Sequence, residues 1–281
     1  MGTSVYAVIG WPVHHSASPA MMNAVFAHCA IDARYIPLAV KPSVLPQAVA
    51  GIRALGIRGV NVTVPHKQAI IPLLDTISDV AEAAGAVNLV RLDADTGRLD
   101  GHNSDMMGWY TSVQDHLPRT TTARVAVLGA GGAARGILAA LAFYTPDVRI
   151  GVTARRLEQA QEVVSSFGSR VQVEAIEWSR REVLIEGADL VINATPIGMW
   201  PHTEASPVDD ARCFRPGQVV QDIVYRPLTT RFLAQAQAQG AMVQDGLWML
   251  VYQGAVSLAY WLDITPPIEV MREAALRHVL G

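Results

Sequence analysis

The sequence predicts an α/β protein of two domains, each built on a mostly parallel β-sheet. Short apolar segments alternate with longer segments of helical pattern along the chain, which is typical of βαβ units. The length of 281 residues suits roughly two domains at about 150 residues each. Hydrophobic residues make up 51% of the chain and charged residues 17%, which supplies apolar material for two cores and excludes a disordered or collagen-like chain.

The N-terminal part of the chain is expected to build the first sheet. The turn-rich segment Asp93–Gly97 predicts a hairpin into a strand at Arg98–His102, which adds an antiparallel pair to an otherwise parallel sheet. Helices are expected at Pro19–Ala30 and Ser43–Leu55. The other strands are expected at Val5–Ile9, Tyr35–Val40, Gly59–Val64 and Val87–Leu92.

A second series of βαβ units follows a polar, threonine-rich segment at Pro118–Ala123, which is interpreted as a boundary. A helix is expected before it, at Asp105–Leu117. The tail Gly246–Gly281 has a helical pattern interrupted at Pro266-Pro267, and this pattern alone fits either domain. The elements expected in between are strands at Arg124–Leu128, Val148–Thr153, Asp189–Asn193 and Val219–Val224 and helices at Gly131–Tyr144 and Arg155–Phe167.

Bulk charge and cysteine content exclude several classes of protein. A formal net charge of −3 and a pI of about 6.2 offer no argument for binding to nucleic acid or to an anionic membrane. The two cysteines, Cys29 and Cys213, are no disulfide framework, and no Cys/His spacing indicates a metal site. The adjacent His14 and His15 have no further ligand nearby in sequence, so no metal is expected.

A cytoplasmic location is expected. The first ten residues carry no basic side chain, and Gly10-Trp11-Pro12 then interrupts the apolar run, which argues against a signal peptide. The most apolar stretch, Gly246–Leu262, contains Gln253 and Gly254 and falls short of the about 20 residues of a spanning helix.

A glycine-rich motif follows the expected strand at Arg124–Leu128. It has the form G-x-G-x-x-A, in which Gly129 allows the tight turn, Gly131 lets the backbone approach a pyrophosphate and Ala134 keeps the helix close to the strand. The helix that follows would offer free N–H groups and its positive dipole end to phosphates. The motif therefore predicts a dinucleotide site, against the alternative of a tight turn that binds nothing.

The next strand indicates which dinucleotide is bound. An NAD site usually has Asp or Glu about 20 residues after the glycine motif, to hold the ribose hydroxyls. Here the strand ends at Thr153-Ala154-Arg155-Arg156, with no acid before Glu158. Because guanidinium groups bind phosphate in a planar fork, Arg155 and Arg156 favour NADP, although both also suit the solvent-facing start of a helix.

Lys67 stands out because only two of the 22 basic residues, Lys41 and Lys67, are lysines. It follows a strand that ends at Pro65, and Pro65 is expected to begin a short helix with Lys67 in its first turn. A cation there faces the positive end of the helix dipole, at a cost of about 0.3–1 kcal/mol. This poor choice for stability favours a role for Lys67 in proton transfer over that of a surface lysine.

Polar residues at two expected helix starts, near Asp105 and near Ser18, suit either a structural role as helix caps or a role in ligand binding. Asp105 suits the first turn of a helix for its charge alone, and Asn103 and Ser104 are good N-cap candidates. Ser18, before Pro19, is a natural N-cap as well. The hydroxyls of Ser16 and Ser18 are two residues apart on an extended segment, so they also suit a bound carboxylate.

Together these motifs resemble the shikimate dehydrogenase family, along nearly the whole chain and in the family's order. The resemblance implies a substrate-binding domain over residues 1–104, completed by C-terminal helices at 246–281, and a Rossmann-type NADP-binding domain over residues 105–245, with the active site in the cleft between them. The matching segments are Gly10–Pro19, Asn61–Lys67, Ala84–Asn88, Gly101–Asp105, Gly129–Arg135, Asn193–Met199, Asp222–Tyr225 and Asp245–Gln253.

The resemblance implies Lys67 and Asp105 as the catalytic pair. In the family the lysine stabilises the oxygen that gains charge and gives it a proton, and the carboxylate keeps the lysine charged and aligned. Ser16 and Ser18 would hold the substrate carboxylate, Thr63, Asn88, Asp105 and Gln253 its hydroxyls, with Tyr225 nearby. The implied cofactor contacts are Gly129, Ala130, Gly131, Gly132, Ala133, Ala134, Arg155, Arg156, Thr195 and Gly246.

The implied activity is the reversible, NADP-dependent reduction of 3-dehydroshikimate to shikimate, a step of aromatic amino acid biosynthesis. It needs a small-molecule substrate and no metal, nucleic acid or membrane, in a monomer or a homodimer. Two alternatives are a paralogue acting on quinate or another cyclic hydroxy acid, and a non-catalytic homologue that senses a ligand.

Five positions depart from the family pattern, and they bear on the substrate. Met22 replaces a common His, Ser104 replaces Thr, and Met106 and Trp248 stand where Gly is common. Tyr252 replaces a small residue. By analogy, Met106 and Trp248 would lie near the nicotinamide or the substrate and reshape the pocket.

Overall fold

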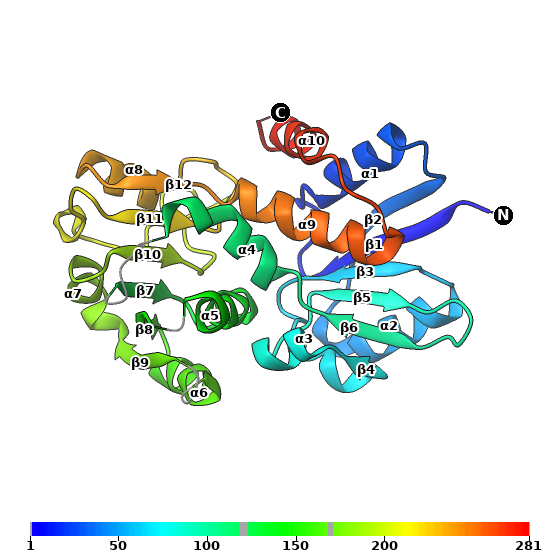
Figure 1. Ribbon diagram of the computed structural model, residues 1–281, viewed down its shortest axis with the longest axis horizontal. Coiled ribbons are helices and arrows are strands. Elements are labelled where there is room, and N and C mark those ends of the chain that lie inside the picture. Colours follow the sequence, from blue (N-terminus) through cyan, green and yellow to red (C-terminus); the bar gives the residue numbers. More distant parts are fainter. Residues whose placement is uncertain (1, 118–122, 146, 168–170, 281) are drawn as a thin grey trace. The chain divides into compact units, whose positions relative to one another are not determined.

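The computed structural model describes residues 2–117, 123–145, 147–167 and 171–280, and its chain divides into two compact units (Figure 1). Unit 1 is Met1–Gly108 with Leu250–Gly281, and unit 2 is Trp109–Met249. Both junctions fall inside helices, α4 (Asp105–Val113) and α9 (Leu247–Leu262). The predicted boundaries lie a few residues earlier, near the helix starts, because a sequence pattern does not show where along a helix its contacts change. Of the predicted boundary segment, residues 118–122 lie outside the described residues.

Unit 1 contains a six-stranded sheet in the order β2-β1-β3-β5-β6-β4. β1 is parallel to β2 and β3, whereas β5 is antiparallel to β3 and β6. The predicted hairpin between β5 and β6 is confirmed, and in its turn the Asp93 carboxylate accepts hydrogen bonds from the amides of Asp95 and Thr96. The strands are β1 (Ser4–Gly10), β2 (Ala33–Ala39), β3 (Gly59–Val62), β4 (Thr76–Ile77), β5 (Leu89–Leu92) and β6 (Leu99–His102).

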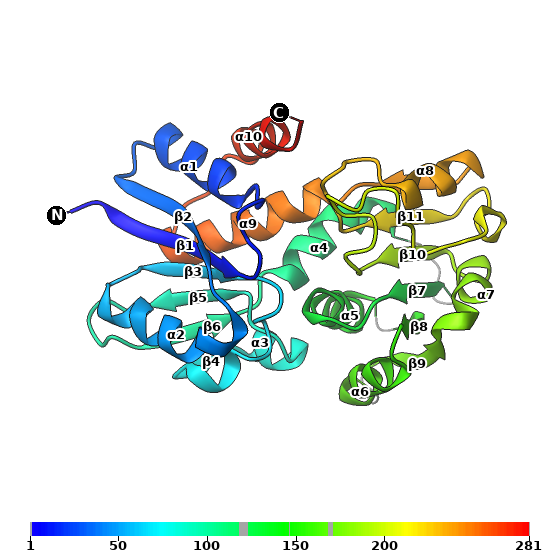
Figure 2. The same cartoon turned by 180° about the vertical axis from the view of Figure 1, so that it is seen from behind.

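Helices cover both faces of the unit 1 sheet. α2 packs its buried side chains on the apolar face of β1, β3 and β5, on the near side in the reverse view (Figure 2). On the opposite face the ring of Tyr6 contacts Phe26 of α1 and Trp261 of α9, at centroid distances of 5.5 and 5.1 Å. The helices expected at Pro19–Ala30 and Ser43–Leu55 and in the C-terminal tail are confirmed. They are α1 (Ser18–His28), α2 (Leu45–Ala54) and α10 (Ile268–Leu280), and α3 (Asp79–Ala84) was not expected.

Unit 2 contains a wholly parallel sheet in the order β12-β11-β10-β7-β8-β9. Numbered within the unit, this is the 3-2-1-4-5-6 order of a dinucleotide-binding fold, in which ligands bind outside the carboxyl ends of the strands where the order reverses. That point lies between β7 and β10. The strands are β7 (Arg124–Leu128), β8 (Arg149–Ala154), β9 (Gln172–Glu177), β10 (Leu190–Asn193), β11 (Val219–Asp222) and β12 (Met242–Gln244).

Four elements of unit 2 were not expected from the sequence: β9, β12, α7 and α8. β9 is an edge strand with polar Gln172, Glu174 and Glu177, which weakens its apolar signal. α7 has only 6 residues, and α8 carries two glutamines, Gln235 and Gln237. The cluster beneath α7 and α8 includes Phe214, Phe232 and Val220. The helices are α5 (Gly132–Tyr144), α6 (Leu157–Phe167), α7 (Arg181–Glu186) and α8 (Arg231–Ala238).

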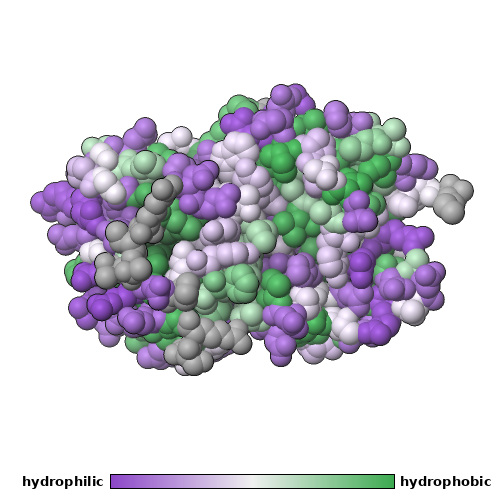
Figure 3. Space-filling model, in the orientation of Figure 1, coloured by the Kyte–Doolittle hydropathy of each residue, from purple (hydrophilic) through white to green (hydrophobic). Residues whose placement is uncertain are grey.

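Large apolar side chains at the surface are scattered rather than gathered in one place. Figure 3 shows green hydrophobic patches interspersed with purple hydrophilic ones on the face that it presents. The most exposed are Leu55, Leu280, Phe143, Val64 and Val183, which lie in different helices and turns. Within the described parts of the chain, no helix combines the length and apolarity needed to span a bilayer.

One buried carboxylate ties the carboxyl ends of β10 and β11 together. Asp222 accepts hydrogen bonds from Asn193 Nδ2 at 3.0 Å and Val224 N at 2.9 Å through Oδ1, and from Thr230 Oγ1 at 2.7 Å through Oδ2. These bonds favour the ionised form, but the side chain is fully shielded from water. The loss of hydration outweighs them and raises the pKa of Asp222 to about 7.

Replacement of Asp222 by Asn should therefore change how stability depends on pH. Between the ordinary pKa near 4 and the raised pKa of about 7, the folded wild type binds a proton that the unfolded chain has lost, so its free energy of unfolding falls as the pH rises. Asp222→Asn mimics the neutral acid and lacks this slope. The free energy of unfolding of the variant minus that of the wild type should therefore increase by about 2 kcal/mol from about pH 5 to about pH 7.

Urea unfolding of both proteins at several pH values measures this difference. Parallel curves for the two proteins would show that Asp222 has the same charge in the folded and the unfolded chain, and would contradict the prediction.

Candidate active site

Lys67 and Asp105 form a close, shielded ion pair in unit 1. Lys67 Nζ donates to Asp105 Oδ2 at 2.5 Å, and the two side chains are only 12% and 5% exposed. Asp105 is the first residue of α4, and Lys67 lies in the turn that follows β3. The pair brings together residues 38 positions apart and leaves the ammonium aligned by a carboxylate.

The other carboxylate oxygen of Asp105 is held by an amide. Asn88 Nδ2 donates to Asp105 Oδ1 at 2.8 Å and to Ser104 Oγ at 3.0 Å, while Asn88 Oδ1 accepts from the Ser104 amide at 2.7 Å. Ser104 Oγ also lies 3.3 Å from Gln253 Oε1. The structure thus brings together four of the predicted site residues, Lys67, Asn88, Asp105 and Gln253.

The expected helix at Pro65 is absent, and the argument from the helix dipole at Lys67 is wrong. Residues 64–70 form turns, and the first helical turn after them is the 3₁₀ segment Ile71–Leu73. The Lys67 carbonyl accepts a hydrogen bond from the Val87 amide at 2.8 Å. The Lys67 carbonyl thus bonds to the segment before β5 and not to an amide one helical turn further along the chain. A contact between such distant segments leaves no pattern in the sequence.

Two of the expected helix caps differ from the prediction. Ser18 is the first residue of α1 and caps nothing; its amide instead donates to Ser16 Oγ at 3.2 Å. Asn103 caps α4, since its Oδ1 accepts from the Met106 amide at 3.2 Å. Ser104, the other expected cap, is buried and bonded to Asn88.

Thr63 lies at the end of β3, next to Gly10 of β1. A Cβ at Gly10 would come within 2.4 Å of the Thr63 methyl group, so glycine there leaves room for the threonine side chain. No hydrogen bond joins Ser16, Ser18 or Thr63 to the Lys67–Asp105 pair within the described residues. The predicted carboxylate and hydroxyl contacts of these three residues remain predictions.

In unit 2 the glycine-rich loop has the geometry that a pyrophosphate requires. Gly129 adopts φ +117°, and a Cβ there would lie 2.8 Å from the Ala194 carbonyl oxygen, so the turn after β7 passes closely over the end of β10. Gly131 precedes α5, and a Cβ there would meet nothing within 4 Å. The open space above this helix N-terminus fits a phosphate, and Ala134 is fully buried behind it.

Arg155 and Arg156 lie at the carboxyl end of β8, between that strand and α6. Both side chains are exposed, and neither takes part in an ion pair with another described residue. They stand on the strand next to the glycine-rich loop, because β8 pairs with β7. This placement suits a phosphate on the adenosine ribose, and it equally suits two solvated residues before a helix.

Thr195 and Gly246 have structural duties of their own. Thr195 Oγ1 donates to Asn193 Oδ1 at 2.7 Å and accepts from the Ile197 amide at 3.1 Å, which closes the loop after β10. A Cβ at Gly246 would lie 2.3 Å from the Ile223 carbonyl oxygen, so only glycine lets the chain pass the end of β11. Their contacts with a cofactor remain predictions, as does the place of Tyr225, which is half-buried.

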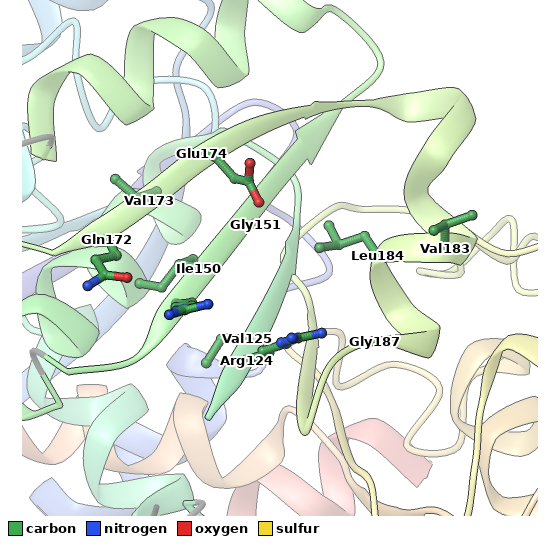
Figure 4. Close-up of a pocket in the computed structure, with 11 residues that line it drawn as sticks. Arg124, Val125, Ile150, Gly151, Gln172, Val173, Glu174, Val183, Leu184 and Gly187 are labelled. Atoms are coloured by element: carbon green, nitrogen blue, oxygen red, sulfur yellow. The ribbon is translucent and has the colours of Figure 1, made fainter. Parts of the chain in front are cut away.

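A hollow in the described surface of unit 2 lies away from these residues. Its volume is about 550 Å³, and its lining includes the first residues of β7, β8 and β9, which are Arg124, Arg149 and Gln172. Figure 4 shows Arg124 and Gln172 there with Val183 and Leu184 of α7. These are the amino ends of the strands, opposite to the edge where such sheets bind nucleotides. The hollow therefore lies at the opposite edge of the sheet from the glycine-rich loop and Arg155. We assign the cofactor site to these residues and not to the hollow.

Sequence reasoning missed two members of the polar network around the site, Asn61 and Ser257. Asn61 is a buried amide in the middle of β3, and Ser257 is a buried hydroxyl in α9. A polar side chain between Val60 and Val62 in a fully buried strand was the available signal. No group of three or more His, Cys, Asp or Glu side chains suited to a metal occurs in the part of the chain that the structure covers.

Comparison with known proteins identifies the family of the chain. Residues 8–90 match the family model described as the shikimate dehydrogenase substrate binding domain, residues 111–204 match the shikimate / quinate 5-dehydrogenase model, and residues 246–276 match the shikimate 5'-dehydrogenase C-terminal domain. A shikimate dehydrogenase (NADP(+)) of Geobacillus kaustophilus is 41% identical over 97% of each chain.

Two solved structures extend the comparison. The shikimate 5-dehydrogenase of Thermus thermophilus, in complex with NADP(H) and shikimate, superposes with a TM-score of 0.86 and 35% identity over 98% of this chain and 99% of that one. A quinate dehydrogenase of Corynebacterium glutamicum, in complex with NAD, gives a TM-score of 0.88 and 30% identity over 99% of this chain and all of that one. By its sequence and its fold, the chain belongs to the shikimate dehydrogenase family.

Proposed function

We propose that the chain is an NADP-dependent dehydrogenase that interconverts 3-dehydroshikimate and shikimate, with Lys67 and Asp105 as its catalytic pair. The observation that carries the proposal is the 2.5 Å ion pair between these side chains, shielded from water and bonded through Asp105 to Asn88. A lysine so enclosed adds little as a surface charge. It is suited to meet an oxygen that becomes negative during a reaction.

The proposed chemistry follows from the donor and acceptor groups of the pair. NADPH, when bound, supplies a hydride to the carbonyl carbon of the substrate. The Lys67 ammonium stabilises the negative charge that develops on the carbonyl oxygen and gives that oxygen a proton, which forms the hydroxyl group. Asp105 holds Nζ in place through Oδ2, while Asn88 keeps Oδ1 from turning away. In the reverse direction Lys67 accepts the hydroxyl proton.

The proposed substrate contacts surround this pair. Asn88, Asp105 and Gln253 already share one hydrogen-bonded network through Ser104, so hydroxyl groups of a ring would exchange for bonds within it. Ser16 and Ser18, at the start of α1, would bind the carboxylate. Thr63 is proposed as a further hydroxyl contact, and Tyr225 as a residue near the substrate.

The proposed cofactor contacts lie in unit 2. The loop from Gly129 to Ala134 would hold the pyrophosphate, since it leaves open space above the N-terminus of α5. Arg155 and Arg156 would bind the phosphate on the adenosine ribose. Thr195 follows β10 and Gly246 follows β12, and both would line the same carboxyl edge of the sheet.

Quinate or another cyclic hydroxy acid is the second candidate substrate. It is favoured by the likeness to the Corynebacterium quinate dehydrogenase and by the bulky residues that depart from the family pattern. Met22, a third position that departs from the pattern, is fully buried with its methyl group close to Gly254 of α9. Met106 is almost fully buried as well, and Trp248 is half-buried, so these two are the positions to revert to Gly if shikimate is not the substrate.

Steady-state kinetics of the purified chain test the proposal. Shikimate and quinate are each measured with NADP and with NAD, and the four values of kcat/KM are compared. We expect shikimate with NADP to dominate. Preference for quinate would select the second candidate. No turnover of either acid by a folded chain that binds NADPH would refute shikimate and quinate as substrates and leave another cyclic hydroxy acid or a ligand-sensing homologue. Sedimentation of the same sample distinguishes a monomer from a homodimer, the two expected states.

Lys67→Ala should lower kcat at least about 100-fold, because it removes the group that gives the proton and stabilises the charge. NADPH binding, followed by its fluorescence, should change less than about twofold, since the cofactor loop is elsewhere in the chain. Lys41→Ala is the matched control, because Lys41 is the other lysine and lies exposed, 5.5 Å from the centre of the Trp11 ring. Equal turnover in the two variants would refute the assigned pair.

Arg155→Ala should weaken NADPH binding about tenfold or more and leave NADH binding nearly unchanged, because NADH lacks the phosphate that the guanidinium would hold. Direct fluorescence titration with each cofactor measures this without turnover. Arg149→Ala removes the same charge from the opposite end of β8 and serves as the control. An equal loss for both cofactors would contradict the phosphate contact.

A further inference from the structure

A row of buried polar side chains crosses unit 1 beneath the residues of the proposed substrate site. Tyr35 of β2 donates its hydroxyl proton to Asn61 Oδ1 at 2.7 Å, and Asn61 Nδ2 donates to Ser257 Oγ of α9 at 2.8 Å. The three residues are 1%, 6% and 0% exposed. A buried amide or hydroxyl without a partner is unfavourable, and each of these three side chains has a partner within the row.

The orientation of the Asn61 amide is determined by its partners. Its Nδ2 lies 3.2 Å from the backbone carbonyl of Asn88, which can only accept a hydrogen bond. The nitrogen therefore faces Asn88 and Ser257, and both of its protons are used. The oxygen faces Tyr35, whose hydroxyl provides the matching proton. An apolar residue at position 61 would fit the core of β3 and lose all three bonds.

Both ends of this arrangement reach residues of the proposed site. The Asn88 carbonyl that Asn61 contacts belongs to the residue whose side chain holds Asp105. Ser257 Oγ donates in turn to the backbone carbonyl of Gln253 at 2.9 Å. Asn61 thus contacts Asn88 directly and Gln253 through one hydroxyl.

Helical spacing explains why α9 suits this purpose. Gln253, Ser257 and Trp261 are four residues apart, so they lie along one face of the helix. The Trp261 ring packs against Gly59 of β3, where a Cβ would come within 2.4 Å of it, and Trp261 Nε1 donates to the Val90 carbonyl at 2.9 Å. The helix is therefore anchored on the sheet by Trp261, located by Ser257, and presents Gln253 one turn further on.

We propose that Asn61 is a positioning residue for the substrate site: with Tyr35 and Ser257 it sets the places of Asn88 and Gln253, the two amides that bind substrate hydroxyls. This inference rests on the proposed function, because it assigns those amides to the substrate. It extends that function to three residues that touch no reacting atom. A purely structural role for the row would lower stability when it is broken and leave the affinity of the folded molecules for substrate unchanged.

Two single-group deletions test the role without adding volume to the core. Ser257→Ala removes the hydroxyl that links Asn61 to Gln253, and Tyr35→Phe removes the hydroxyl that orients Asn61. We expect KM for shikimate to rise about three- to tenfold in Ser257→Ala and about two- to threefold in Tyr35→Phe, the effect of one neutral hydrogen bond. KM for NADP should stay within about twofold, and kcat should change less than KM for shikimate.

The double variant shows whether the two hydroxyl groups act together through Asn61 or independently of each other. If both hydroxyls act through Asn61, the rise in KM in Tyr35→Phe/Ser257→Ala should be smaller than the product of the two single effects. A rise equal to that product would overturn the role of Asn61 as the common element.

Ser112→Ala is the matched control for stability. Ser112 is also a buried helical serine whose hydroxyl donates to a backbone carbonyl, that of Trp109 at 2.7 Å, and accepts from an amide, that of Gln221 at 3.3 Å. It should lower the melting temperature about as much as Ser257→Ala, with KM for shikimate unchanged. If Ser257→Ala and Tyr35→Phe behave in the same way as this control, the positioning role is refuted.

The wild type separates this outcome from failure of the proposed function. Absence of shikimate turnover by the wild type would refute the proposed function, and with it the assignment of these amides to that substrate. Turnover by the wild type with an unchanged KM in both variants would refute the positioning role alone.

Discussion

The Asp105 carboxylate is bonded on both of its oxygens, and the polar network of the candidate site depends on this constraint. A shielded carboxylate needs a cation and hydrogen-bond donors, which Lys67 and Asn88 supply. Asn88 must then be held in its turn, by the Ser104 amide on its side chain and by Val62 and Asn61 on its carbonyl. The ion pair thereby determines side chains on β3, α4 and the segment before β5.

Close backbone approach is the second theme, and it places the loops that follow the strands of unit 2. The turn after β7 passes over the Ala194 carbonyl, and the start of α9 passes over the Ile223 carbonyl. Both contacts need glycine, at positions 129 and 246. A similar contact occurs in unit 1, where a Cβ at Gly108 of α4 would lie 2.6 Å from the Gln253 amide nitrogen. Packing alone therefore accounts for several glycines of the family pattern, whatever they contact in a ligand.

The two-unit α/β fold was predictable for two reasons. Most of its strands are apolar runs, and the glycine-rich motif marks a tight turn between a strand and a helix. Elements with weaker patterns, such as the edge strand β9 and the glutamine-bearing helix α8, were missed. At the site, the family pattern indicated Lys67 and Asp105, but the expected helix around Lys67 does not form, since its carbonyl bonds to distant Val87 instead. Hydrogen bonds between elements far apart in sequence, such as that of Asn61 with Ser257, could not be predicted. The sequence shows only a polar residue within an apolar strand.

The near absence of lysine from this arginine-rich chain has a practical chemical consequence. An amine-directed reagent meets two lysine side chains, one exposed beside Trp11 and one enclosed beside Asp105. An ammonium group must lose its proton and leave its carboxylate before it can be acylated, so the enclosed amine should react far more slowly. The ratio of the two labelling rates is therefore an internal gauge of whether the ion pair is closed, readable by mass spectrometry on the unmodified sequence.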